Sequence, residues 1–317
     1  MATRELSATP SLGPLFARAG VGVIPGASRL PFVGGGGGEV PDEALALSEV
    51  AIDRARLAAY DRVCGFDVSD IVPTTYPHLL AFPLQLALMT SGAFPVPAIG
   101  LVHIANRIEQ HRPIDARERL SLRVWATPLY PHPRGQQFML RSEARVGGEL
   151  VWEEASLNLR RGRRDDAAAP PPAPPDASHL APAATWRLRD DLGRRYGAVS
   201  GDLNPIHVHP LTARLFGFRT AIAHGMWTKA RCLAQLGPEL PEAFAVEVAF
   251  RKPILLPATV QFAEAPHDDG IIFGVRDSRR EAQHLDGLLT PAGGRSREAG
   301  AGTASAADRR AASGGKS

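Results

Sequence analysis

The chain has 317 residues, of which 44% are apolar, 22% are charged and 6% are aromatic. This length is enough for two domains of roughly 100 to 150 residues each. The 36 Lys and Arg residues and 33 Asp and Glu residues leave a formal charge of +3, and residues 291–317 alone hold five basic and two acidic side chains. The rest of the chain is therefore formally neutral, which argues against nucleic acid as a partner.

The cysteines and the N-terminus predict a cytoplasmic protein. Cys64 and Cys232 lie far apart and in no metal-binding spacing, as in a reduced chain. Residues 1–40 contain charges and prolines and lack the apolar core of a signal peptide. Residues 79–104 carry no Asp, Glu, Lys or Arg, but prolines and glycines interrupt them. They are predicted to form a buried helix followed by a strand and not a membrane span.

Low-complexity segments indicate where the domains begin and end. Residues 34–38 are five consecutive glycines, typical of a flexible connector. Residues 165–175 hold five prolines and favour an extended spacer. Beyond Pro291 the chain is mostly Gly, Ala, Ser and Arg, which cannot bury enough apolar surface to fold. We therefore predict a flexible segment 1–40, a first unit 41–164, a Pro-rich linker 165–181, a second unit 182–290 and a disordered tail 291–317.

The two units share a sequence pattern and look like duplicates. The matching pairs are Tyr60 with Tyr196, Val63 with Val199 and Gly65 with Gly201 at an offset of 136, then Thr74 with Thr220 and His78 with His224 at an offset of 146. The second unit thus carries ten extra residues between Gly201 and Thr220. These residues are rich in polar side chains, so the second unit is expected to act and the first to support it.

Hydrophobic periodicity predicts one long helix and an antiparallel meander in each unit. The expected helices are 79–89 and 225–236. The expected strands are 101–107, 120–130, 136–144 and 150–159 in the first unit, and 245–250, 259–262 and 271–276 in the second. In residues 246–250, the large apolar side chains of Val246, Val248 and Phe250 alternate with Glu247 and Ala249, which is the period of a half-buried strand. This pattern predicts an α+β fold in which a sheet wraps around a central helix.

The second unit contains a long polar motif, Tyr196-Gly-Ala-Val-Ser-Gly-Asp-Leu-Asn-Pro-Ile-His207, followed by Ala223-His-Gly-Met226. This pattern resembles the signature of the MaoC-like dehydratases, the (R)-specific enoyl-CoA hydratases of the hydratase 2 type. The resemblance covers most of residues 40–289 and implies two fused hot-dog units, the first with a degenerate, non-catalytic copy of the motif. Residues 100–113 look especially like the actinobacterial 3-hydroxyacyl-thioester dehydratases. The resemblance implies reversible dehydration of a 3-hydroxyacyl thioester in fatty-acid metabolism, with neither metal nor organic cofactor.

The residues of the motif suit this chemistry. Removal of water needs a base for the α-proton, a proton for the departing hydroxide, and donors for the thioester oxygen. Asp202 and His207 are five residues apart across a turn at Asn204-Pro205, where Asn suits a helix cap and Pro the first helical position. We expect the turn to bring both side chains onto one water. Which of the two acts as acid and which as base stays open.

Four further residues are candidates to bind the substrate. If Gly225 opens the central helix, its N–H points outward toward developing negative charge, and the resemblance implies that it is the oxyanion donor. Some members of that family carry a serine about eight residues later, where this chain has Leu233. Ser200 or Tyr196 is expected to take over that orienting role, with Asn204 beside them. His224 is expected to be structural, and Arg251 and Lys252 either contact carrier phosphates or are solvated.

The first unit lacks the ten extra residues, so open space is expected above its helix. Ala81, Phe82, Leu84 and Leu88 are the candidates to line this space and receive a long acyl chain. The substrate carrier is either coenzyme A or acyl carrier protein, and the assembly is either a monomer or a homodimer. A hot-dog thioesterase and a non-catalytic acyl-thioester binder remain the alternatives.

Overall fold

The computed structural model describes residues 1–21, 38–237, 240–268, 270–279 and 282–292. The glycines at 34–37 and the tail beyond residue 292 lie outside these residues. Within the described part, no helix combines the length and the apolar character needed to cross a membrane. Cys64 and Cys232 are both buried free thiols.

The first unit contains the predicted helix and all four predicted strands. Its elements are β2 (Glu43–Ala51), α2 (Arg54–Cys64), α3 (Tyr76–Met89), β3 (Val102–Gln110), β4 (Arg119–Ala126), β5 (Tyr130–His132), β6 (Gly135–Val146) and β7 (Glu149–Arg161). Strand β2 was not predicted, because its sequence EALALSEVA is rich in residues of high helix propensity. Antiparallel pairing with β4 makes it a strand.

The second unit begins after residues 162–181, which contain no helix or strand. Its elements are β8 (Pro182–Leu188), α4 (Leu192–Ser200), α5 (Pro205–Val208), α6 (Pro210–Leu215), α7 (Gly225–Leu236), β9 (Phe244–Phe250), β10 (Ala258–His267), β11 (Gly270–Asp277) and β12 (Gln283–Pro291). The predicted helix and three strands are confirmed. Strand β12 was missed because Asp286 and Gly287 disfavour a strand, yet pairing on both sides with β11 and β9 makes it central.

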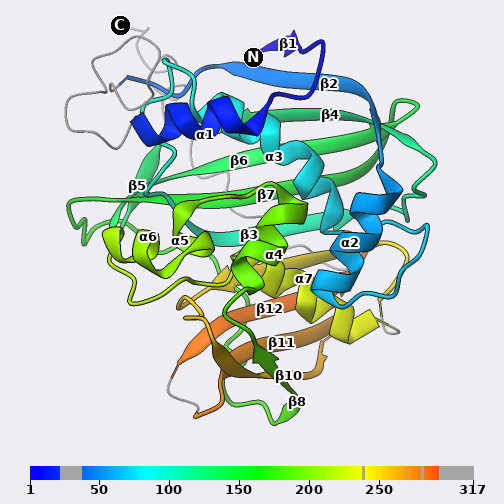
Figure 1. Cartoon of the computed structure of the whole chain (residues 1–317), viewed down its shortest axis with the longest axis vertical. Helices are drawn as coiled ribbons and strands as arrows, with labels where there is room; N and C mark the ends of the chain where they lie inside the picture. Colours follow the sequence, from blue (N-terminus) through cyan, green and yellow to red (C-terminus); the bar gives the residue numbers. More distant parts are fainter. Residues whose placement is uncertain (22–37, 238–239, 269, 280–281, 293–317) are drawn as a thin grey trace, which may run out of the picture.

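The strands form one sheet in which the two units repeat the same order. The path runs β1-β2-β4-β6-β7-β3-β9-β12-β11-β10-β8, and β3 pairs with β9 where the units meet. Read outward from that pair, the first unit runs β3-β7-β6-β4-β2 and the second β9-β12-β11-β10-β8. Corresponding strands therefore occupy corresponding places. The helices lie across the sheet as Figure 1 shows, which confirms the α+β, double hot-dog arrangement.

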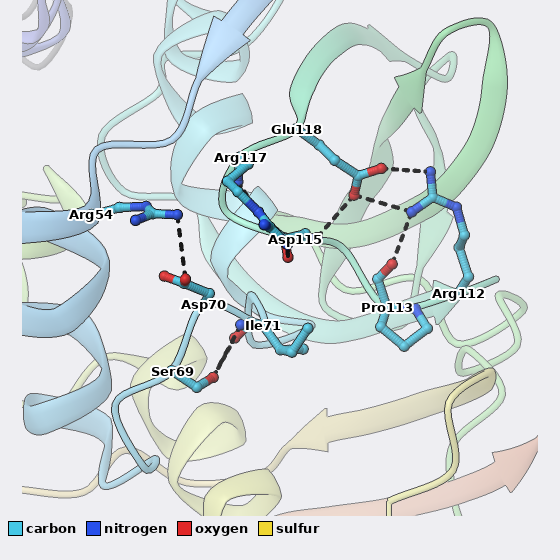
Figure 2. Close-up of polar contacts among 9 residues, drawn as sticks. All are labelled: Arg54, Ser69, Asp70, Ile71, Arg112, Pro113, Asp115, Arg117 and Glu118. Atoms are coloured by element: carbon cyan, nitrogen blue, oxygen red, sulfur yellow. Dashed lines mark hydrogen bonds and ion pairs between the residues drawn. The ribbon is translucent and has the colours of Figure 1, made fainter.

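The ten extra residues of the second unit account for the helices α5 and α6. The matching connection in the first unit, 66–75, is held down instead by the loop at 112–118. The Val72 N–H donates to the Ile114 carbonyl at 2.9 Å, and the Ala116 N–H donates to the Asp70 carbonyl at 2.7 Å. Figure 2 shows the polar contacts beside them, including Arg54 with Asp70 at 3.3 Å. Residues 66–75 are thus hydrogen-bonded to the loop between β3 and β4.

The prediction of a flexible N-terminal segment 1–40 is wrong for residues 1–21. Strand β1 (Ala2–Glu5) pairs in parallel with β2, and helix α1 (Leu12–Val21) packs on α3. Leu12, Leu15, Phe16 and Ala19 recur at intervals of three and four residues, so they share one face of the helix. Burial of this face, together with the pairing of β1, orders residues 1–21, which the prediction grouped with the glycine-rich connector in one flexible segment.

A buried polar network joins the units beneath the helices. The Lys229 side chain of α7 is fully buried, and its Nζ donates to Asn106 Oδ1 on β3 and to the Val246 carbonyl on β9. Asn106 Nδ2 in turn donates to Glu154 Oε1 at 2.7 Å, and His78 Nδ1 lies 2.7 Å from the same oxygen. Buried polar groups are tolerated when they are paired in this way. Burial nevertheless lowers the pKa of Lys229 to about 7.

The lowered pKa of Lys229 predicts that the stability of the protein depends on pH. Between about pH 7 and its ordinary pKa of 10.5, the unfolded chain keeps the Lys229 proton and the folded chain has lost it. The unfolded state then binds more protons, so this residue's contribution to stability increases as pH rises. We expect the unfolding free energy of the wild type, minus that of Lys229→Met, to increase by up to ~1.4 kcal/mol per pH unit. Urea unfolding of both proteins across this pH range measures the difference in unfolding free energy. A difference that stays constant with pH contradicts the lowered pKa of Lys229.

Candidate active site

A cavity of about 360 Å³ lies between the helix of the first unit and the polar motif of the second. It is bordered by α3, by α5, by the start of α7, and by the ends of β3, β7 and β9. The six residues that the sequence singled out all line it, namely Tyr196, Ser200, Asp202, Asn204, His207 and Gly225. Tertiary folding thus brings the motif and the His-Gly pair together at one site.

Asn204 and Pro205 position His207 as the sequence predicts. Asn204 Oδ1 accepts a hydrogen bond from the Ile206 N–H at 3.4 Å, and Pro205 is the first residue of α5. The His207 side chain is buried, and its Nδ1 lies 2.8 Å from the Ile222 carbonyl. Since that carbonyl can only accept, Nδ1 carries the proton and the lone pair of the neutral ring is on Nε2.

The turn before α5 holds Asp202. The Ser200 hydroxyl accepts a hydrogen bond from the Asp202 N–H at 3.1 Å, and the Asn204 N–H donates to Asp202 Oδ1 at the same distance. Ser200 therefore supports the turn, and Asn204 both caps the helix and orients the carboxylate. The Asp202 side chain keeps 30% of its surface accessible.

His224 has a larger part in the site than the sequence indicated. Its ring stacks on that of His207 with 3.7 Å between centroids. Its Nε2 lies 3.0 Å from the Asp202 main-chain oxygen and 3.8 Å from Oδ2 of the same residue. The Tyr196 ring also packs against the His224 ring, with 4.8 Å between their centroids. His224 therefore contacts both Asp202 and His207 and fixes their relative position, which only the three-dimensional contacts show.

Burial and mutual contact set the charges of the three side chains. Burial lowers the pKa of His224 to about 3, and it lowers the pKa of His207 despite the neighbouring Asp202 carboxylate. Burial alone would raise the pKa of Asp202, but the adjacent imidazoles and the Asn204 N–H hold it below its ordinary value. At neutral pH the site therefore combines an ionised carboxylate with two neutral imidazoles.

Gly225 begins α7 and faces the cavity. The N–H of a first helical residue has no intrahelical acceptor, and within the described residues no side chain or main-chain oxygen accepts from it. A Cβ at this position would come 3.0 to 3.2 Å from the Phe250 ring. The helix start thus offers a free donor and a favourable dipole, and a larger residue would displace Phe250.

Asp202, His207 and His224 each offer one ligand atom within 4.8 Å of the others, so their spacing alone would suit a metal ion. The hydrogen bonds favour a different arrangement. Since the Asp202 carbonyl can only accept, His224 Nε2 carries the proton. The lone pair that a metal would need is then on Nδ1, which is buried without a hydrogen-bond partner. These residues fit a proton-transfer site better than a metal site.

The wall of the cavity on α3 differs in part from the prediction. Phe82 lines it, together with His78, Gln85, Leu86 and Met89. These residues recur every three or four positions and share one face of the helix. Ala81, Leu84 and Leu88 were predicted to line the space, but they lie in the buried core and not on the cavity. Apolar side chains of α3 lie both on the face toward the core and on the face toward the cavity, so residue type alone does not indicate which of them line the cavity.

Large side chains line the corresponding region beside α7, where a more open hollow of about 390 Å³ remains. At the offset of 146, Trp227 and Arg231 replace Ala81 and Gln85. Trp227 Nε1 donates to the Val63 carbonyl at 2.9 Å, within the degenerate copy of the motif. The Arg231 guanidinium lies 5.0 Å above the Trp186 ring and reaches the Gly65 carbonyl at 3.4 Å. Helix α7 thus packs directly on the degenerate motif.

Known proteins match the chain along most of its length. Residues 171–286 match a family model described as the MaoC like domain. Over 269 residues the chain is 38% identical to 3-hydroxyacyl-thioester dehydratase X of Mycobacterium tuberculosis, covering 84% of this chain and 94% of that protein. The chain therefore belongs to the MaoC-like dehydratase family, which confirms the resemblance inferred from the motif.

Comparison with solved structures supports the same family. The crystal structure of HtdX from M. tuberculosis superposes with a TM-score of 0.70 at 37% identity, over 78% of this chain and 99% of that one. A MaoC-like dehydratase from Phytophthora capsici superposes with a TM-score of 0.65 at 18% identity, over 80% and 96% of the two chains. The second likeness shows the shared fold alone.

Close packing of α4 on α5 predicts a sensitive glycine. Gly193 is the second residue of α4, and a Cβ there would overlap the main-chain oxygen of His207. Gly13 is the second residue of α1, and a Cβ there would meet nothing within 4 Å. We expect Gly193→Ala to lower the unfolding free energy by about 1 to 3 kcal/mol. Gly13→Ala, the matched control, should raise it by up to about 1 kcal/mol through helix propensity. Urea unfolding measures both changes in free energy. Equal changes in the two variants would refute the close contact between Gly193 and the His207 main chain.

Proposed function

We propose that this protein catalyses the reversible dehydration of (R)-3-hydroxyacyl thioesters to trans-2-enoyl thioesters. The observation that carries the proposal is the pairing of an ionised Asp202 with a neutral His207 in a cavity that also contains the free N–H of Gly225. The 38% identity to a 3-hydroxyacyl-thioester dehydratase supports it. The reaction and its (R) stereochemistry are proposed by analogy with the MaoC-like dehydratase family.

The geometry meets the three needs of the reaction. In hydration the oxygen of water bonds to C3, the electrons of the double bond move toward the thioester oxygen, and C2 takes up a proton. Asp202 and His207 Nε2 are both acceptors that can hold this water and receive its proton. The pair then delivers one proton to C2, so its charge is unchanged after a turnover. The Gly225 N–H donates to the thioester oxygen as negative charge develops there.

The carrier of the acyl group is either coenzyme A or acyl carrier protein. Arg251 and Lys252 line the cavity at the end of β9. Arg251 Nε lies 2.6 Å from Asp286 Oδ2, so its guanidinium is held in place by a buried carboxylate. Lys252 has no salt-bridge partner within 4.0 Å among the described residues. We propose that Lys252 contacts a carrier phosphate, which both carriers possess.

Substitution of the catalytic pair tests the proposed function. We expect Asp202→Asn and His207→Ala each to lower kcat/KM for crotonyl-CoA hydration by ~10² to 10⁴, the usual contribution of an acid–base group. Loss of the enoyl-thioester absorbance measures the rate, and circular dichroism checks the fold. His209→Asn is the control, because His209 is an exposed cap of α6 and asparagine keeps that cap. Near wild-type turnover by either site variant refutes the roles, and release of free thiol by the wild type would indicate a thioesterase.

The pH profile gives a second test. The working state needs an ionised Asp202 and an unprotonated His207 Nε2, and the pKa of each lies below its ordinary value. As pH falls, protonation of His207 removes the acceptor. We therefore expect the acid limb of kcat/KM to have its midpoint below about 6.5, the ordinary imidazole value. A midpoint at or above that value contradicts the assignment of a buried neutral His207.

A further inference from the structure

The two units cover their central helices differently. In the second unit the extra residues fold into α5 and α6, and Ile206, Phe216 and Phe218 from this segment line the cavity. In the first unit, main-chain hydrogen bonds of Asp70 and Val72 join the matching connection to the loop at 112–118, and Arg54 also contacts Asp70 (Figure 2). That connection contributes no residue to the cavity. The side of the cavity above α3 needs another cover.

Helix α1 supplies this cover. Leu12 packs directly over Gly201, beside the polar motif, since a Cβ on that glycine would overlap Leu12 Cδ1. One turn later, the Phe16 ring lies 6.3 Å from the Phe82 ring of α3. Phe16 and Ala19 both line the cavity, and Ala19 is only 4% exposed. Figure 1 shows α1 close to one end of α3, on the same face of the sheet.

The strand before α1 holds this helix in place. Strand β1 pairs with β2 at the edge of the sheet, and the Leu6 N–H donates to the Ala46 carbonyl at 2.8 Å. The N-terminal ammonium lies 3.0 Å from Asp42 Oδ2, and the Ser48 hydroxyl donates to Glu5 Oε1 at 2.8 Å. With α1 attached on this side and packed on α3 on the other, its inner face is a fixed wall.

We infer that α1 forms the wall of the acyl-chain site and that Ala19 determines the length of chain the protein accepts. This inference rests on the proposed function for the identity of the ligand as an acyl thioester. The cavity extends from Asp202 and His207 past Phe82, Leu86 and Met89, and those three side chains are apolar. A hydrocarbon chain gains affinity for each methylene that leaves water for such a surface. The methyl group of Ala19 leaves room that a larger side chain on α1 would take from the distal methylenes.

The two faces of α1 allow a matched experiment. Ala19 faces the cavity, and Ala17 is exposed on the other side of the same helix. We expect Ala19→Phe to weaken binding of the saturated thioester lauroyl-CoA by about tenfold or more, because it displaces two or more methylenes. Binding of butyryl-CoA should not change. Ala17→Phe should leave both affinities at the wild-type value. Isothermal titration calorimetry measures all of them without turnover.

A graded variant separates filling of the cavity from damage to the fold. Ala19→Leu should weaken lauroyl-CoA binding less than Ala19→Phe and should again spare butyryl-CoA. Equal losses for both thioesters, equal losses in the Ala17 and Ala19 variants, or no binding of lauroyl-CoA by the wild type would each overturn the inference. Crotonyl-CoA hydration is measured separately. Chain-length-selective binding without hydration would refute the proposed function and leave the role of α1 standing.

Discussion

Pairing of β3 with β9 is the interaction on which the rest of the structure depends. It joins the sheets of the two units and removes an exposed edge from each, where unpaired main-chain groups would otherwise face solvent. Arg107 and Glu247 lie opposite each other in this pair and form a salt bridge of 2.9 Å. Below the helices, Lys229 crosses the same boundary to Asn106. The result is that α3 of one unit and the polar motif of the other border a single cavity.

The two units share a topology but have diverged at the places that decide chemistry. The second keeps Asp202 and His207 and folds its extra residues into α5 and α6, whereas the first holds its shorter connection at the end of the sheet. The first unit's α3 directs Phe82, Leu86 and Met89 toward the cavity, whereas α7 bears Trp227 and Arg231 against the degenerate motif. One unit thus provides the catalytic groups and the other the space for an acyl chain. Neither unit alone contains the whole site.

Order at the N-terminus completes this division. The inner face of α1 packs on α3 and lines the cavity, and β1 extends the sheet at its edge. A segment outside both repeats has therefore become part of the cavity. The three side chains at its catalytic end show the same interdependence, because His224 stacks on His207 and hydrogen-bonds to the main chain of Asp202.

The sequence by itself determined the repeat, the central helices, most strands and the residues of the motif, because helical and strand periods, cap residues and a long polar pattern are local signals. It could not determine that β2 is a strand, since its alanines and glutamates favour helix until β4 pairs with it. It also missed the ordered α1, the contact of His224 with Asp202 and the face of α3 that lines the cavity. Those features depend on which surfaces meet after folding, and contacts between residues distant in the chain leave no local periodicity to read. Only the tertiary structure decided them.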